Sequence, residues 1–281
     1  METGLDWVAG DELYFPPTAS HPRHHDYLTV ASYLPDTGRL VLTSAFEYYH
    51  FGAKSSTGDD YNGVDMRGLA ILLTRNIVIQ GDASNDWGCA TLTHDRTEAD
   101  RSVRTGTTIF DNVEMYRCGQ ADTFKTAIRF EGARKSVDSE IRNTVVWGGN
   151  AKNLMIKLSN NINVRDSSFI GGKQLSVIMT STNNVHLDNI FVGDLVARPS
   201  SGAKGIVDKE GGVAFCSLVN NNVCPDSSVT NSRVAGVIYG GFIAPGHNCG
   251  ATNTKFKNNV SHSNNGAGAY IYPDPESNLK T

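Results

Sequence analysis

Short apolar runs separated by Asn, Gly and Asp recur along most of the chain. The run Thr74–Gly81 enters through Asn and leaves through Gly, and the same phrase returns at Ser159–Asp166 and Thr182–Asp188. Asn160 and Asn183 are 23 residues apart. A period of about 20 to 25 residues predicts stacked supersecondary units, each of which buries its apolar side chains only against its neighbours.

The breaks between these runs are rich in residues that tolerate a left-handed backbone, and they predict tight corners. Of the 24 Asn residues, 20 lie at or after position 143, where Asn at one corner of every coil can form a side-chain ladder. The leucine pattern of leucine-rich repeats is absent, and so is a 3.6-residue apolar period. The sequence therefore predicts an all-β fold, a right-handed parallel β-helix with coils of roughly 22–27 residues.

A second set of apolar runs predicts one further strand per coil, so that equal positions of successive coils share one face of a parallel sheet. These expected strands are 127–131, 154–158, 176–180, 212–216, 239–243 and 268–272. The coils are expected from about Leu72 to Tyr272.

The first part of the chain has a different pattern. Tyr27–Tyr33 and Gly38–Thr43 carry β-branched and aromatic residues between Pro, Gly and Asp turns, which is typical of antiparallel hairpins. We expect residues 1–71 to form a β-domain that caps the solenoid formed by residues 72–281. The Ser-, Gly- and Lys-rich stretch Ala197–Gly211 breaks the period and predicts a loop insertion.

Charge and composition narrow the classes of function. The net charge of −4 leaves no basic surplus for phosphate groups, so we expect no nucleic-acid partner. No apolar stretch is long enough to cross a membrane. The start Met1–Trp7 is acidic and lacks the apolar core of a signal peptide, which is expected of a cytosolic protein or of a piece of a larger one.

Five cysteines favour an oxidising compartment, with free buried thiols as the alternative. No CxxC pair occurs, which argues against structural zinc or a thioredoxin motif. Cys216 and Cys224 are 8 residues apart across an Asn-rich turn, and we predict a disulfide between them rather than between Cys224 and Cys249. A second bridge between Cys89 and Cys118 would leave Cys249 unpaired.

Metal ligands are weakly represented. The histidines of the loop His21–His25 are expected to be solvated, and Asp59–Asp60 with Asp65 lack EF-hand spacing. We therefore expect no metal and no cofactor, with calcium as an unsupported alternative. Asn259 begins the one glycosylation sequon, Asn259-Val-Ser, which matters if the protein is secreted.

Several segments together resemble a known family. Trp7–Glu12, Gly63–Arg67 and Leu73–Gly81 resemble the later part of a G8 domain. Val234–Phe242 and Phe256–Asn264 are similar to the β-helix that follows it in fibrocystin-like proteins and in the cell-surface hyaluronidases. The resemblance implies an extracellular or cell-surface setting, within a larger ectodomain whose neighbouring domains are partners.

The resemblance also shows where this chain departs from the hyaluronidases. Their strand histidines align with Arg129, Glu131 and Lys157, while Arg67 and Asp65 are kept. Histidine exchanges protons near neutral pH, and arginine does not. The resemblance therefore implies a structural or recognition segment of a fibrocystin-like surface protein, with no catalytic residue.

The replaced positions still form a candidate site. Arg129 and Glu131 share one face of a strand, and Lys157 is expected about 5 Å away on the next rung. A surface ion-pair ladder is the plain interpretation. The alternatives are a contact to an anionic extracellular polysaccharide that also uses Arg67 and Asp65, or a polysaccharide hydrolase or lyase with Arg129, Glu131 and Lys157 as catalytic residues.

Overall fold

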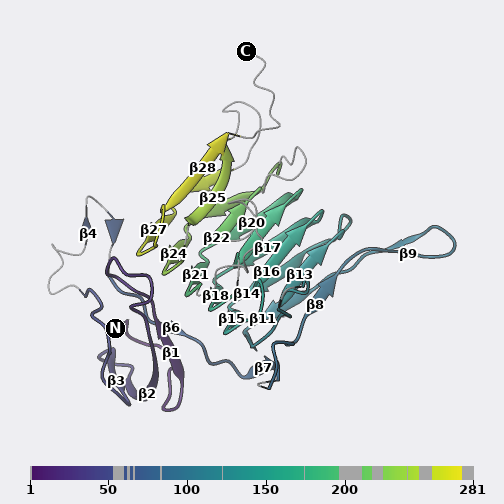
Figure 1. Ribbon diagram of the computed structural model, residues 1–281. Helices are drawn as coiled ribbons and strands as arrows, with labels where there is room; N and C mark the ends of the chain where they lie inside the picture. The colour runs from purple at the N-terminus through teal and green to yellow at the C-terminus, as the bar shows by residue number, and fades with distance from the viewer. Residues whose placement is uncertain are drawn as a thin grey trace.

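The protein is a parallel β-solenoid with an antiparallel sheet beside it (Figure 1). The structure is a computed structural model that describes residues 2–52, 60–61, 64–65, 67–82, 84–121, 123–173, 175–195, 211–216, 224–238, 240–246 and 255–273. Within these ranges every regular element is a β-strand, which confirms the predicted all-β class.

Each coil contributes one strand to each of three parallel sheets. Sheet one consists of β7 (Ile77–Gln80), β12 (Val113–Tyr116), β15 (Val145–Trp147), β18 (Ser168–Ile170), β21 (Phe191–Gly193), β24 (Arg233–Ala235) and β27 (Val260–His262). Sheet two consists of β8 (Thr91–Thr93), β13 (Ile128–Glu131), β16 (Leu154–Lys157), β19 (Val177–Thr180), β22 (Gly211–Phe215), β25 (Gly240–Gly246) and β28 (Ala269–Pro273). Sheet three consists of β11 (Ile109–Asp111), β14 (Ser139–Arg142), β17 (Asn160–Arg165), β20 (Asn183–Asp188), β23 (Ser228–Thr230) and β26 (Lys255–Lys257).

The core is a set of columns that run along the solenoid axis. Residues in register from coil to coil point inward together, as Ile128, Leu154, Val177, Val213 and Phe242 do in sheet two. Each of these side chains is at most 2% exposed. A single coil is too thin to bury its own apolar side chains. They are buried because similar side chains of the neighbouring coils pack above and below them.

The predicted asparagine corner is present at the end of the sheet three strands. Asn143, Asp166, Asn189 and Asn231 all have a left-handed backbone, with φ between 49° and 52°. The Asn189 Nδ2 atom donates to the Oδ1 atom of Asp166 on the coil below at 2.8 Å. Because short polar side chains tolerate this conformation and bond to one another between coils, they turn every coil at the same corner.

The prediction that three similar runs occupy equivalent places in the coil was wrong for the first of them. The run Thr74–Gly81 contains β7, whose Ile77 pairs with Val113 in sheet one. The runs Ser159–Asp166 and Thr182–Asp188 contain β17 and β20 of sheet three. The three runs share an Asn before an apolar strand, and that signature occurs at more than one corner of the coil.

The antiparallel sheet is formed by β1 (Glu12–Phe15), β2 (Asp26–Leu34), β3 (Arg39–Leu42) and β6 (Ile71–Leu72). The two predicted hairpin strands correspond to β2 and β3. Two short antiparallel pairs complete the described strands: β4 (Asp60–Tyr61) with β5 (Val64–Asp65), and β9 (Arg96–Thr97) with β10 (Val103–Arg104). The β9–β10 hairpin projects away from the solenoid (Figure 1).

The N-terminal sheet packs on the flank of the solenoid, whereas we expected it to cap the open end. Tyr14 of β1 is fully buried against Phe191 of sheet one, with ring centroids 6.0 Å apart. The same cluster includes Val145 and Ile170, from the middle of sheet one. The first strand of that sheet stays uncovered, and Ile77 is 55% exposed. Val145, Ile170 and Phe191 are outward apolar side chains of sheet one, and the N-terminal sheet covers them.

Both predicted disulfides are confirmed. Cys89 and Cys118 are linked with Cα atoms 4.4 Å apart, and Cys216 and Cys224 with Cα atoms 5.8 Å apart. Cys249 lies outside the described residues, as does the expected insertion Ala197–Gly211 except for Gly211, which begins β22. Among the described residues no helix is long and apolar enough to cross a membrane.

Candidate functional site

The structure brings Arg129, Glu131 and Lys157 together on the outer face of sheet two. Glu131 pairs in register with Lys157 of the next coil, and their charged atoms Oε1 and Nζ lie 3.1 Å apart. The Arg129 Nη2 atom contacts the Oε2 atom of Glu131. Arg129 also donates from Nη1 to the carbonyl oxygen of Phe124 at 3.1 Å.

In this triad both cations face the same carboxylate. Partial burial alone would raise the pKa of Glu131, but the hydrogen bond from Lys157 and the charge of Arg129 outweigh it, and the pKa is below its ordinary value. The three side chains are between 20% and 41% exposed, so each pair contributes under about 1 kcal/mol. The arrangement is that of an ion-pair ladder between coils.

The other predicted binding residues lie on different elements. Asp65 ends β5, and Arg67 is exposed on the segment that leads into β6. The sequon residue Asn259 is half-buried at the sheet three corner. Its Oδ1 atom accepts from the Ser232 backbone N–H at 3.0 Å, and its Nδ2 atom donates to the Val229 carbonyl oxygen at 2.9 Å.

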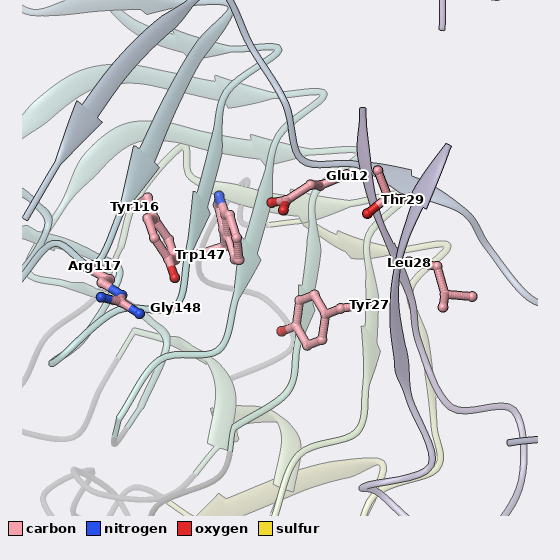
Figure 2. A pocket seen from close by; sticks show the side chains of 8 residues that line it. All are labelled: Glu12, Tyr27, Leu28, Thr29, Tyr116, Arg117, Trp147 and Gly148. Atoms are coloured by element: carbon pink, nitrogen blue, oxygen red, sulfur yellow. The ribbon is translucent and has the colours of Figure 1, made fainter. Parts of the chain in front are cut away.

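A groove that the sequence did not predict lies between the N-terminal sheet and sheet one. It encloses about 360 Å³. Figure 2 shows Tyr27 of β2 facing the rings of Tyr116 and Trp147, with Arg117 beyond Tyr116. The lining residues are Glu12, Tyr27, Leu28, Thr29, Tyr116, Arg117, Trp147 and Gly148.

Three aromatic rings form the wall of this groove. Tyr116 and Trp147 hold the same position in successive strands of sheet one, and their rings stack at 4.1 Å with an interplanar angle of 27°. The Tyr27 ring lies 6.1 Å from the Trp147 ring at 28°. The guanidinium carbon of Arg117 lies 4.9 Å from the centre of the Tyr116 ring, a cation–π arrangement that fixes a planar group of N–H donors beside the aromatic wall.

Hydrogen bonds and a glycine set the position of these rings. The indole Nε1–H of Trp147 donates to Glu114 Oε1 at 2.9 Å, and the other Glu114 oxygen accepts from the Arg75 backbone N–H at 3.2 Å. Gly148 has φ +60°, and a Cβ atom there would come within 2.8 Å of the Tyr116 ring. Glycine at the corner after β15 adopts the left-handed backbone without strain and leaves room for the ring beside it.

A more polar hollow adjoins the aromatic groove. Arg117 and Gly148 line both spaces, and the hollow is completed by Asp82, Ser84, Asn85, Asp86 and Asn150. It also encloses about 360 Å³. The side-chain and backbone hydrogen bonds from Ser84 hold the pKa of Asp82 below its ordinary value. Carboxylates, amides and a guanidinium thus provide both acceptors and donors for a polar ligand.

A partly buried polar cluster joins the Tyr27 side of the groove to the solenoid. The Tyr27 hydroxyl donates to Asp194 Oδ2 at 2.6 Å, and His25 Nε2 lies 3.5 Å from Asp194 Oδ1. Burial raises the pKa of Asp194, although His25, Tyr27 and Arg23 act in the opposite direction. The same burial, with the nearby Asp194 charge, raises the pKa of the Tyr27 hydroxyl, which stays protonated as the donor.

The histidine loop is used for packing. His21 stacks on His24 at 4.4 Å, and His24 stacks on Tyr48 at 4.5 Å. Across the described part of the chain, no group of three or more His, Cys, Asp or Glu side chains is arranged to hold a metal ion.

One sequence signal for the groove was available. Tyr116 and Trp147 end two successive sheet one strands, and aromatic residues at equal positions of adjacent coils predict a stacked pair. Tyr27 and Glu12 carried no such signal, because they reach the groove from a separate sheet. No protein-family model and no curated protein matches this sequence.

Proposed function

We propose that this protein is a non-catalytic recognition segment of a secreted or cell-surface protein and that it binds a polysaccharide in the aromatic groove. The observation that carries the proposal is the convergence of Tyr27, Tyr116 and Trp147 with Arg117 on one open space of about 360 Å³. Sugar rings present C–H groups that pack on aromatic surfaces, and hydroxyl groups that bond to fixed polar side chains.

The extracellular part of the proposal rests on two kinds of support. Two disulfides link Cys89 with Cys118 and Cys216 with Cys224, and such bonds persist in oxidising compartments. The resemblance to G8-containing, fibrocystin-like proteins implies the same setting and adds neighbouring domains of a larger ectodomain as partners.

We favour the groove over the Arg129–Glu131–Lys157 triad for chemical reasons. The two cations of the triad already pair with one carboxylate, so an anionic glycan would have to displace an internal ion pair. A catalytic acid needs a proton to give at working pH, and the lowered pKa of Glu131 keeps that carboxylate ionised. The groove offers aromatic surface and donors that need no such exchange.

Native gel electrophoresis through gels that contain soluble polysaccharides tests the proposal. We expect at least one polysaccharide to retard the wild-type protein, and Trp147→Ala to weaken the affinity about tenfold through loss of one aromatic contact. Because Trp147 also packs against the N-terminal sheet, Arg117→Ala is a second variant that removes no buried apolar side chain.

Tyr49→Ala is the matched control, since Tyr49 is an aromatic residue that is 72% exposed and does not line the groove. Thermal melts check that each variant is folded. If no polysaccharide retards the wild type, or if Trp147→Ala and Arg117→Ala bind as it does, the groove is not a polysaccharide site.

A further inference from the structure

An exposed tryptophan is next in sequence to the residues that line the polar hollow. Trp87 follows Asp86, a lining residue of the hollow, and is 63% exposed. An exposed aromatic ring offers an apolar face with a polar N–H, and aromatic side chains of this kind are frequent in ligand sites.

The turn that presents Trp87 is fixed by its own polar groups. The Trp87 backbone N–H donates to Asn85 Oδ1 at 2.8 Å, and Asp82 accepts from the Ser84 backbone N–H at 2.9 Å. Trp87 also forms an isolated antiparallel bridge with Gln120. The ammonium group of Lys125 lies 5.6 Å from the ring centre. A ligand therefore meets a ring whose backbone is already placed, which lowers the entropic cost of binding.

Positive and negative side chains balance along the two adjoining spaces and beside Trp87. Three carboxylates line them, from Glu12, Asp82 and Asp86, against the single guanidinium of Arg117. Lys173 stands 2.9 Å from Asp86 and pairs with one of the three. With Lys125 beside the Trp87 ring, three cations match the three carboxylates, so the site has no surplus of positive charge to attract an anionic polymer.

We infer that the groove and the hollow form one extended site for a neutral polysaccharide, with the Tyr116–Trp147 pair at one subsite and Trp87 at another. This inference rests on the proposed function and names its ligand class. Neutral sugars fit the lining because each hydroxyl both donates and accepts, and the amides of Asn85 and Asn150 stand beside the carboxylates of Asp82 and Asp86. This ligand class differs from the anionic polysaccharide that the sequence indicates as an alternative.

The experiment measures affinity for two sets of probes in native gels. The neutral probes are a soluble β-glucan, a xylan and a mannan, and the anionic probes are hyaluronan and polygalacturonate. Each is tested at low salt and at about 1 M NaCl, where the Debye length is about 3 Å. The variants are Trp87→Ala and the double variant Asp82→Asn with Asp86→Asn, and Tyr49→Ala is the control.

We expect a neutral probe to bind, with little change at high salt, and Trp87→Ala to weaken it about tenfold by removing one aromatic contact. The double variant removes two negative charges, so hyaluronan and polygalacturonate should bind more tightly to it than to the wild type. Because Trp87 is largely exposed, its loss should leave the melting temperature unchanged.

The two proposals fail in different ways. Absence of binding to every probe overturns the proposed function and this inference with it. Binding that is sensitive to Trp147→Ala but favours the anionic probes, or that Trp87→Ala leaves unchanged, overturns only the extended neutral site.

Discussion

The hydroxyl group of Tyr27 attaches the N-terminal sheet to the solenoid through the buried carboxyl group of Asp194. We predict that Tyr27→Phe, which removes only this hydroxyl, destabilises the protein. The hydrogen bond is 2.6 Å long, and the Asp194 side chain is 10% exposed, so water cannot freely replace the lost donor. A hydrogen bond to a charged group contributes about 2 kcal/mol, and one between neutral groups about 1 kcal/mol.

The loss should depend on pH. Burial raises the pKa of Asp194, so the native protein loses stability as pH rises from the ordinary carboxyl range through this raised value. The Tyr27 hydroxyl opposes that rise, and Tyr27→Phe therefore raises the pKa of Asp194 further. The cost of the substitution should be about 2 kcal/mol at a pH above the raised pKa of Asp194, where the carboxyl group is ionised, and about 1 kcal/mol at about pH 3, where it is protonated.

Urea unfolding followed by circular dichroism, at both pH values, gives the free energies of unfolding. Tyr49→Phe is the matched control, because it removes a hydroxyl from a residue that is 72% exposed. An equal loss at both pH values would show that the charge of Asp194 plays no part. A loss no larger than that of the control would refute the role of the hydrogen bond altogether.

Three further predictions concern the corner, the disulfides and the triad. Gly148→Ala should lower the free energy of unfolding by about 1–2 kcal/mol, because a left-handed backbone disfavours Ala. It should also weaken polysaccharide binding, because the new Cβ displaces the Tyr116 ring. Urea unfolding and affinity gels measure the two effects, and an unchanged affinity would contradict the placement of that ring. Cys89→Ser should lower the free energy of unfolding by about 3–4 kcal/mol and Cys216→Ser by about 2–3 kcal/mol, because the first bridge closes a loop of 29 residues and the second a loop of 8. Equal losses in urea unfolding would argue against this dependence on loop length. Lys157→Ala should lower stability by less than about 1 kcal/mol and leave polysaccharide affinity unchanged, and a lost affinity in the gel assay would return the binding site to the triad.

The repeat pattern was enough to predict the solenoid, because its physical cause is local. Each corner needs a residue that accepts positive φ, and each strand needs inward apolar positions, so both signals recur with every coil. The expected strand 154–158 corresponds to β16, and the expected strand 176–180 to β19. The first run was aligned with the wrong strand of the coil, because Asn76 precedes a sheet one strand while Asn160 begins a sheet three strand.

The groove depended on information that the repeat does not contain. Its two walls come from segments far apart in the sequence, with residues 12–29 on one and residues 116–148 on the other, and no periodicity links them. Whether the N-terminal sheet covers the end or the flank of the solenoid is decided by the outward apolar residues of sheet one, such as Val145 and Ile170. In a single sequence those residues look like further core positions.

The central claim is that a polysaccharide binds in the groove between the N-terminal sheet and sheet one. A crystal of the protein soaked with an oligosaccharide of the polysaccharide that binds tests it most directly. We predict ordered sugar density against Tyr116, Trp147 and Arg117. Sugar density on the Arg129–Lys157 face of sheet two, with the groove empty at saturating concentration, would contradict the claim.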